Sequence, residues 1–193
     1  MHEDGATHRQ VLLVRERAMM PRLVYALVLA VTLVTSSAVA QLPQDATVSK
    51  IQTLAEQGNA IAQFTLGLAF DNGRPGIPPN YTEALTWYRR AADQGLDLAQ
   101  LYLGHMYDYG KGGPPNYTEA LTWYRCAAEQ GLSSAQYNLG LMYAKGDGVP
   151  QNYAEAVQWL RRATEQGLAE AQGALGLMYA LGHGVPQDNV QAQ

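Results

Sequence analysis

The chain has few of the residues that commonly carry metal, redox or nucleic-acid chemistry. Among its 193 residues there is one cysteine, Cys126, so no disulfide can form within the chain. Its 13 basic residues are fewer than its 17 acidic ones, which gives a net charge of −4. Such a chain offers no basic stripe for phosphate contacts, and we therefore expect no nucleic-acid partner.

Motifs for catalysis are also absent. His105 and His183 are the only histidines beyond residue 40, and no Cys or His spacing resembles a zinc site. The sequence contains no phosphate-binding loop, no dinucleotide fingerprint and no Gly-x-Ser-x-Gly elbow. We predict that the protein is not an enzyme and that it has neither a metal site nor a small-molecule cofactor.

No apolar run is long enough for a comfortable transmembrane helix, which needs about 20 residues. The longest candidate is Leu23–Thr35, which follows Arg22 and precedes a small-residue stretch ending at Ala40. A positive flank, a short apolar core and an Ala-x-Ala end predict a signal peptide over residues 1–40, with translation starting at Met19 or Met20. The protein is then exported, to the periplasm or the medium. An uncleaved signal segment is the alternative, and would be the chain's only membrane contact.

The chain does have a sequence repeat of 36 or 37 residues. Leu-Gly pairs, tryptophans and Gln-Gly pairs recur at this spacing. The glycines of the first set are Gly67, Gly104, Gly140 and Gly176, and the tryptophans are Trp87, Trp123 and Trp159. A fixed period in this range predicts a solenoid, in which each unit buries its apolar face against its neighbours. The fold class expected is all-α, with helix-turn-helix repeats.

One repeat shows how the two helices are expected to form. Helix A covers about Leu98–Tyr109, where Gly104 in mid-helix indicates close approach of a neighbouring helix. Helix B begins at Asn116, whose side chain caps the helix, while Glu119 reaches back to complete a capping box. Gly131 ends helix B, because a glycine accepts the left-handed backbone there.

Several residues that resemble functional motifs are better explained as parts of the helical scaffold. Asn80 and Asn116 lie in glycosylation patterns, but both are expected to be helix caps. The recurrent tyrosines and tryptophans occupy repeat-equivalent packing positions. Cys126 stands where the flanking repeats have arginine, and an intermolecular disulfide is the alternative to a tolerated thiol.

The two ends of the array depart from the pattern. Residues 41–58 align with a B helix in which Lys50 replaces the tryptophan, which predicts an N-terminal capping helix. Residues 59–193 hold three full repeats and one incomplete repeat. The last A helix, Glu170–Leu181, is complete, but only a few residues of its B helix follow from Asp188. We expect its apolar side chains to lack a cover; these are Leu175, Met178 and Tyr179.

One face of the A helices is the candidate binding surface. An exposed apolar strip with a polar rim usually marks an interaction site. Phe64, Leu101 and Tyr137 are its expected anchors at one repeat position, and the full set is Phe64, Leu68, Leu101, His105, Asp108, Tyr137, Leu141 and Lys145. Of these, His105, Asp108 and Lys145 are expected to orient the ligand. The alternative is that the superhelix buries part of this strip between successive A helices.

The recurring strings resemble a known repeat family. Ala-Glu-Ala-Val-Gln-Trp-Leu-Arg-Arg-Ala-Thr-Glu-Gln-Gly at 154–167, followed by Ala171-Gln172 and Leu175-Gly176-Leu177-Met178-Tyr179, closely resembles the Sel-1-like repeat. The family is related to the tetratricopeptide repeats. The resemblance implies a right-handed α/α superhelix whose A helices line a concave groove. It also implies an exported adaptor or scaffold that binds a protein or peptide partner.

Two other functions stay open at this point. Cysteine-rich relatives of the family are described as β-lactamases or penicillin binders, so an enzyme of the cell envelope is one alternative by analogy. This chain lacks their paired cysteines and has no Ser-x-x-Lys nucleophile motif. The other alternative is a structural subunit that docks through its open C-terminal edge.

Overall fold

The computed structural model describes residues 44–74 and 76–184, and within them the protein is all-α. The two compact units of the chain are Met1–Ser49 and Lys50–Gln193, and helices α3 to α9 lie in the second. The helices are α2 (Gln44–Glu56), α3 (Ala60–Asn72), α4 (Tyr81–Asp93), α5 (Asp97–Asp108), α6 (Tyr117–Glu129), α7 (Ser133–Lys145), α8 (Tyr153–Glu165) and α9 (Ala169–Ala180). The predicted fold class, an all-α helical repeat superhelix, is confirmed.

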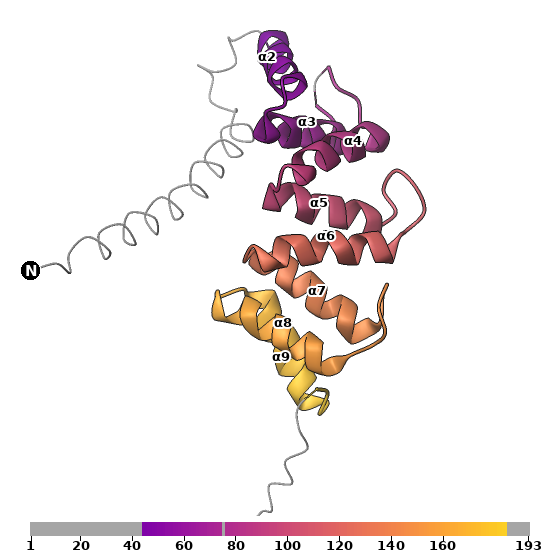
Figure 1. Cartoon of the computed structure of the whole chain (residues 1–193), viewed down its shortest axis with the longest axis vertical. Helices are drawn as coiled ribbons and strands as arrows, with labels where there is room; N and C mark the ends of the chain where they lie inside the picture. The colour runs from indigo at the N-terminus through magenta and orange to yellow at the C-terminus, as the bar shows by residue number, and fades with distance from the viewer. Residues whose placement is uncertain (1–43, 75, 185–193) are drawn as a thin grey trace, which may run out of the picture. The chain divides into compact units, whose positions relative to one another are not determined.

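The helices alternate between two roles along the chain. The A helices are α3, α5, α7 and α9, and the B helices are α2, α4, α6 and α8. From α3 onward each helix packs against the next one in sequence, so that every inner B helix lies between two A helices (Figure 1). This stacking is the arrangement that the 36-residue sequence repeat predicts.

The predicted asparagine caps are present. The Oδ1 atoms of Asn80, Asn116 and Asn152 accept hydrogen bonds from backbone N–H groups in the first turns of α4, α6 and α8. The second half of the predicted capping box is wrong. The backbone N–H of Asn116 donates to the Tyr107 carbonyl at the end of α5, and the Glu119 carboxylate turns outward to other partners.

The glycines of the A helices lie where the B helices come closest. A methyl carbon added at Gly67 would lie 2.6 Å from the Tyr88 ring, and one at Gly104 would lie 2.5 Å from the Tyr124 ring. These distances confirm the close approach expected from the sequence. At Gly140 the equivalent contact is to Leu160, at 2.9 Å, whereas among the described residues none lies within 4 Å of a methyl carbon added at Gly176 in α9.

A buried glutamine on each inner A helix joins three helices. The Nε2 groups of Gln63, Gln100 and Gln136 donate to carbonyls in the last turn of the preceding B helix. Their Oε1 atoms accept from a glutamine at the end of the following B helix, at 2.7–2.8 Å. Both polar groups of each buried amide are therefore satisfied, which fixes the register of the helices.

The fourth repeat differs in part from the expectation. Leu175 and Met178 are buried in a cluster with α8 residues, so the expectation that they lack a cover is wrong. Helix α8 covers the side of α9 that faces the array. Tyr179 is exposed, and its hydroxyl accepts a hydrogen bond from Arg161 at 3.0 Å.

At the N-terminal end, α2 lies within the segment for which a capping helix is predicted. Its last turn contacts α3, because the Ala55 carbonyl accepts the hydrogen bond from Gln63. The predicted signal peptide, residues 1–40, lies outside the described residues. Among the helices that are described, none has the length and apolar character needed to cross a membrane.

The glycine contact generates a prediction with a matched control. Gly104→Ala forces a methyl group against the Tyr124 ring and is expected to lower stability by about 1–3 kcal/mol. Gly176→Ala meets no neighbour in residues 44–74 and 76–184 and should raise stability by about 0.5–1 kcal/mol, because alanine favours the helix. Thermal unfolding of dilute protein, followed by circular dichroism, measures both. Shifts of the unfolding temperature that are equal in sign and size for the two variants would contradict the close contact at Gly104.

Candidate binding site

The structure corrects two of the three expected anchors. Phe64 is 2% exposed and Leu101 is 6% exposed, so neither offers a side chain to a ligand. The Phe64 ring lies between Tyr88 of α4 and Tyr102 of α5, with centroid distances of 5.7 and 5.3 Å. The next A helix covers this position, which is the alternative that the sequence left open. Tyr137 is half-buried.

A partly exposed group of side chains surrounds His105 of α5, whose ring centroid lies 5.9 Å from that of Tyr102 and 5.9 Å from that of Tyr109. The Asn138 Nδ2 atom of α7 lies 2.9 Å from His105 Nε2. The ring centroid of Tyr124 of α6 lies 5.5 Å from that of the His105 imidazole. These five residues are called the His105 cluster.

The exposure within the His105 cluster is uneven. Tyr109 is 70% exposed at the C-cap of α5, whereas Tyr102, His105 and Asn138 are half-buried. Tyr124 is buried, and its hydroxyl donates to Asp108 at 3.2 Å. The cluster therefore presents one solvent-exposed aromatic ring, that of Tyr109, beside polar groups that are half-buried or buried.

Burial lowers the pKa of His105. Asp108 and Asp71 oppose the shift, and Lys111 adds to it. The imidazole is therefore neutral at pH 7, with one ring nitrogen as donor and the other as acceptor. A neutral imidazole beside the Asn138 amide can hydrogen-bond to a peptide without adding charge.

The charged groups around His105 are themselves held in place. Asp71 is buried and pairs with Lys111, whose Nζ lies 2.7 Å from its Oδ1. The Tyr88 hydroxyl also points to this carboxylate, at 3.5 Å. Burial and the adjacent carboxylate raise the pKa of Tyr88, so its hydroxyl stays protonated. Asp71 thereby ties the first repeat to the loop after α5.

The remaining predicted site residues border the cluster unequally. Leu68, Asp108 and Leu141 are half-buried, and Lys145 is exposed at the end of α7. Asp108 lies close enough to His105 to act on it electrostatically. Tyr102 and Asn138 were missed, although each directly follows a predicted anchor position.

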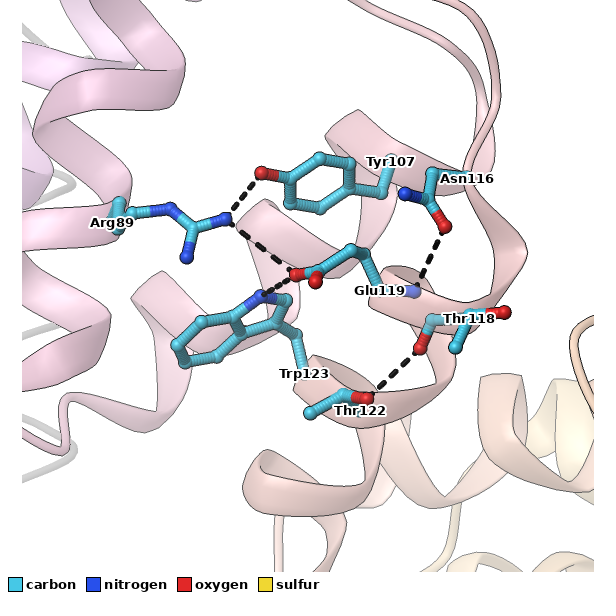
Figure 2. Close-up of polar contacts among 7 residues, drawn as sticks. All are labelled: Arg89, Tyr107, Asn116, Thr118, Glu119, Thr122 and Trp123. Carbon is cyan, nitrogen blue, oxygen red and sulfur yellow. Dashed lines mark hydrogen bonds and ion pairs between the residues drawn. The ribbon is translucent and has the colours of Figure 1, made fainter.

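A polar network around Arg89 has a structural role. Figure 2 shows the Arg89 guanidinium between the Tyr107 hydroxyl, to which it donates, and the Glu119 carboxylate at 3.6 Å. The Trp123 Nε1–H donates to the same carboxylate at 3.2 Å (Figure 2). Arg125–Tyr143 and Arg161–Tyr179 repeat the arginine–tyrosine hydrogen bond one and two units later. The network joins each B helix to the next A helix.

Metal-binding groups do not gather in the part of the chain that is described. No three His, Cys, Asp or Glu side chains there are placed to hold a metal ion. Cys126 is half-buried, and burial raises the pKa of its thiol, which disfavours the reactive thiolate. An open pocket of about 310 Å³ beside the loop before α6 is lined mainly by Leu85, Met106 and Pro115 with their neighbours.

The comparisons with known proteins agree with the repeat geometry. The model of the Sel1 repeat matches four consecutive stretches, residues 60–96, 97–132, 133–168 and 169–193. A plant protein, the "ERAD-associated E3 ubiquitin-protein ligase component HRD3A" of Arabidopsis thaliana, is 36% identical over 58 residues, which are 30% of this chain and 9% of that protein.

Solved structures show the same fold. The protective antigen c5321 of uropathogenic Escherichia coli, described as having an SLR fold, is 43% identical with a TM-score of 0.68, covering 70% of this chain and 29% of that one. A Sel1 repeat protein from Oxalobacter formigenes is 42% identical with a TM-score of 0.68, covering 73% and 56%. The Helicobacter pylori cysteine rich protein B shares the fold at 20% identity, with a TM-score of 0.53, over 68% and 93%. The chain thus spans well under two thirds of the plant protein and of the first two structures.

The low pKa of His105 predicts how stability depends on pH. Below pH 6.5 the unfolded chain binds a proton at this residue more readily than the folded one, so stability is lost as pH falls from 7.5 to 5.5. The loss from this group is at most about 1.4 kcal/mol per pH unit. His105→Gln should flatten the slope in urea unfolding series at several pH values. An unchanged or steeper slope in the variant would refute the assignment.

Proposed function

Because the chain belongs to the Sel1 repeat family, we propose that it is a non-enzymatic adaptor that binds a protein or peptide through the His105 cluster. Sel1 repeat proteins typically mediate protein–protein interactions. The plant relative is a component of a ubiquitin-ligase assembly, which supports a role within a larger protein assembly.

The exposed ring of Tyr109 is the observation that carries this proposal. A tyrosine that is 70% exposed at the end of a helix, with its ring tilted against a half-buried histidine, contributes nothing evident to the core. Tyrosine is enriched at protein interfaces, since a rigid ring and a hydroxyl give contact area and a hydrogen bond at little entropic cost. A partner can cover this ring without unfolding any element.

The surrounding groups have complementary roles in the proposed site. Asn138 supplies an amide that can reach peptide groups, as does the neutral imidazole beside it. Leu141 gives an apolar neighbour on α7, and Lys145 and Asp108 give charges of both signs at the rim. Such a site fits an extended peptide with an apolar side chain over Tyr109 and backbone groups toward Asn138. Phe64 and Leu101 act only as scaffold in this proposal.

The proposed location is outside the cytoplasm, in the periplasm or the medium. The support is the sequence pattern of residues 1–40, with its positive flank, short apolar core and Ala-x-Ala end. N-terminal sequencing of the protein recovered from the envelope fraction tests it. A mature N-terminus at Gln41 is expected, and a chain that retains Leu23–Thr35 in the cytoplasm would overturn it.

The binding proposal is tested by removing the exposed ring. Tyr109→Ser with Asn138→Ser should reduce capture of partners from the native envelope fraction at least about tenfold, since a lost hot-spot side chain costs about 2 kcal/mol. Helix content should not change, because neither residue is buried. Quantitative mass spectrometry of the captured proteins is the measurement.

Tyr117→Ser is the matched control. Tyr117 is also an exposed tyrosine at a helix end, but it lies at the start of α6, outside the His105 cluster. The control should capture the same partners as the original chain. If the Tyr109→Ser, Asn138→Ser variant captures as much partner as the original chain, the proposed site is wrong.

A further inference from the structure

The open pocket of about 310 Å³ lies where the loop between α5 and α6 contacts α4. Leu85 of α4, Met106 and Tyr107 at the end of α5, and loop residues 111–116 line it. Most of this lining is apolar, and none of these residues belongs to the His105 cluster. The pocket is therefore a separate feature of the surface, and its origin lies in the sequence of the loop.

The same loop recurs one repeat later, between α7 and α8. Each loop has a glycine with a left-handed backbone, Gly112 with φ of 85° and Gly148 with φ of 69°. Each also returns to its A helix through a 2.8 Å hydrogen bond, in which the backbone N–H of the capping asparagine donates to a tyrosine carbonyl. The residue after the glycine thus takes the same place in both loops, before a proline; it is Gly113 in the first loop and Val149 in the second.

In the later loop this place is filled by a side chain. Val149 packs against the buried cluster that includes Leu121 and Met142, and Leu121 is 8% exposed. Leu85 is the equivalent of Leu121 one repeat earlier, and it is only half-buried. It lines the pocket together with Gly113, which has no side chain to cover it. The pocket is thus the space that an aliphatic side chain fills in the next repeat.

We propose that the pocket binds a branched aliphatic side chain, valine or isoleucine, from an extended segment of a partner protein. The chain itself uses these two residues at the equivalent position. Val149 is one, and Ile77 of the first repeat, which is 8% exposed, is the other. The partner's side chain lies where Gly113 has none, and its burial is favourable in proportion to the apolar surface that leaves water.

Two polar side chains at the pocket can hold the backbone of such a segment. The Lys111 ammonium donates to the buried Asp71 carboxylate at 2.7 Å, and the lysine side chain is 40% exposed. An ammonium has three N–H donors, so Lys111 has donors to spare for a ligand. Asn116 caps α6 through its Oδ1 atom, which leaves its Nδ2 amide group as a donor. Both groups complement the partial negative charge of peptide carbonyl oxygens, and this match favours a peptide over a plain hydrocarbon as the ligand.

A variant at Gly113 closes the pocket without straining the loop. Gly113 does not have a positive φ, and a methyl carbon added there meets no heavy atom within 4 Å in the described part of the chain, its chain neighbours aside. Gly113→Val therefore gives this loop the residue that Val149 supplies in the next one. The variant is expected to fold like the original chain and to have its own side chain in the pocket.

NMR of methyl-labelled methionines in the full chain tests the proposal. Met106 lines the pocket, and Met142, its equivalent one repeat later, belongs to the cluster that Val149 covers. The probe is the capped tripeptide N-acetyl-Gly-Ile-Gly-amide, and the capped Gly-Gly-Gly peptide is the matched ligand. Titration with the probe should shift the Met106 signal and leave the Met142 signal unchanged. The glycine peptide should bind at least about tenfold more weakly, because it lacks the side chain that is buried.

Exchanging the residues of the two loops gives the decisive result. Gly113→Val should abolish the shift of the Met106 signal, and Val149→Gly should open a second pocket, so that the Met142 signal then responds to the probe. Gly113→Val fills space rather than opening it, so its result does not depend on how well the Val149→Gly chain folds. No shift of Met106 in the original chain, equal binding of the two peptides, or an unchanged titration of the Gly113→Val chain would each overturn the proposal.

Discussion

The contact between a glycine of α3, α5 or α7 and a large residue of the B helix that follows is the constraint on which the structure depends. Because Gly67 and Gly104 lack side chains, the Tyr88 and Tyr124 rings lie directly on the A-helix backbone. This approach brings the helix ends close enough for the buried glutamines to bond three helices together. The first three repeats use the same contact, so these units stack in one register.

The surface left for binding follows from this stacking. One side of each inner A helix is covered by its B helix, and another is covered by the neighbouring A helices, which is why Phe64 and Leu101 are buried. Only a narrow strip remains, and in α5 it carries His105 and Tyr109. Binding to a partner in this fold therefore depends on the residues that are not buried in contacts between helices.

The sequence predicted the features that depend on neighbouring residues or on the repeat itself. The asparagine caps, the role of Gly104 and the alternation of helices are of this kind, because each is set within one 36-residue unit. The sequence placed Leu101 on the exposed face, but Leu101 is buried and the next residue, Tyr102, is half-buried. Burial there depends on the rotation between successive repeats, which a repeat period does not encode. The predicted return contact of Glu119 failed for a similar reason, since Arg89 and Trp123 compete for its carboxylate.

Amide hydrogen exchange of the full chain tests the central claim, that the contact with a B helix on the glycine side stabilises each A helix. The amides of α9 should exchange much faster than those of α5 and α7, which pack against a B helix on both sides. Protection of α9 that equals that of α7 would contradict the account.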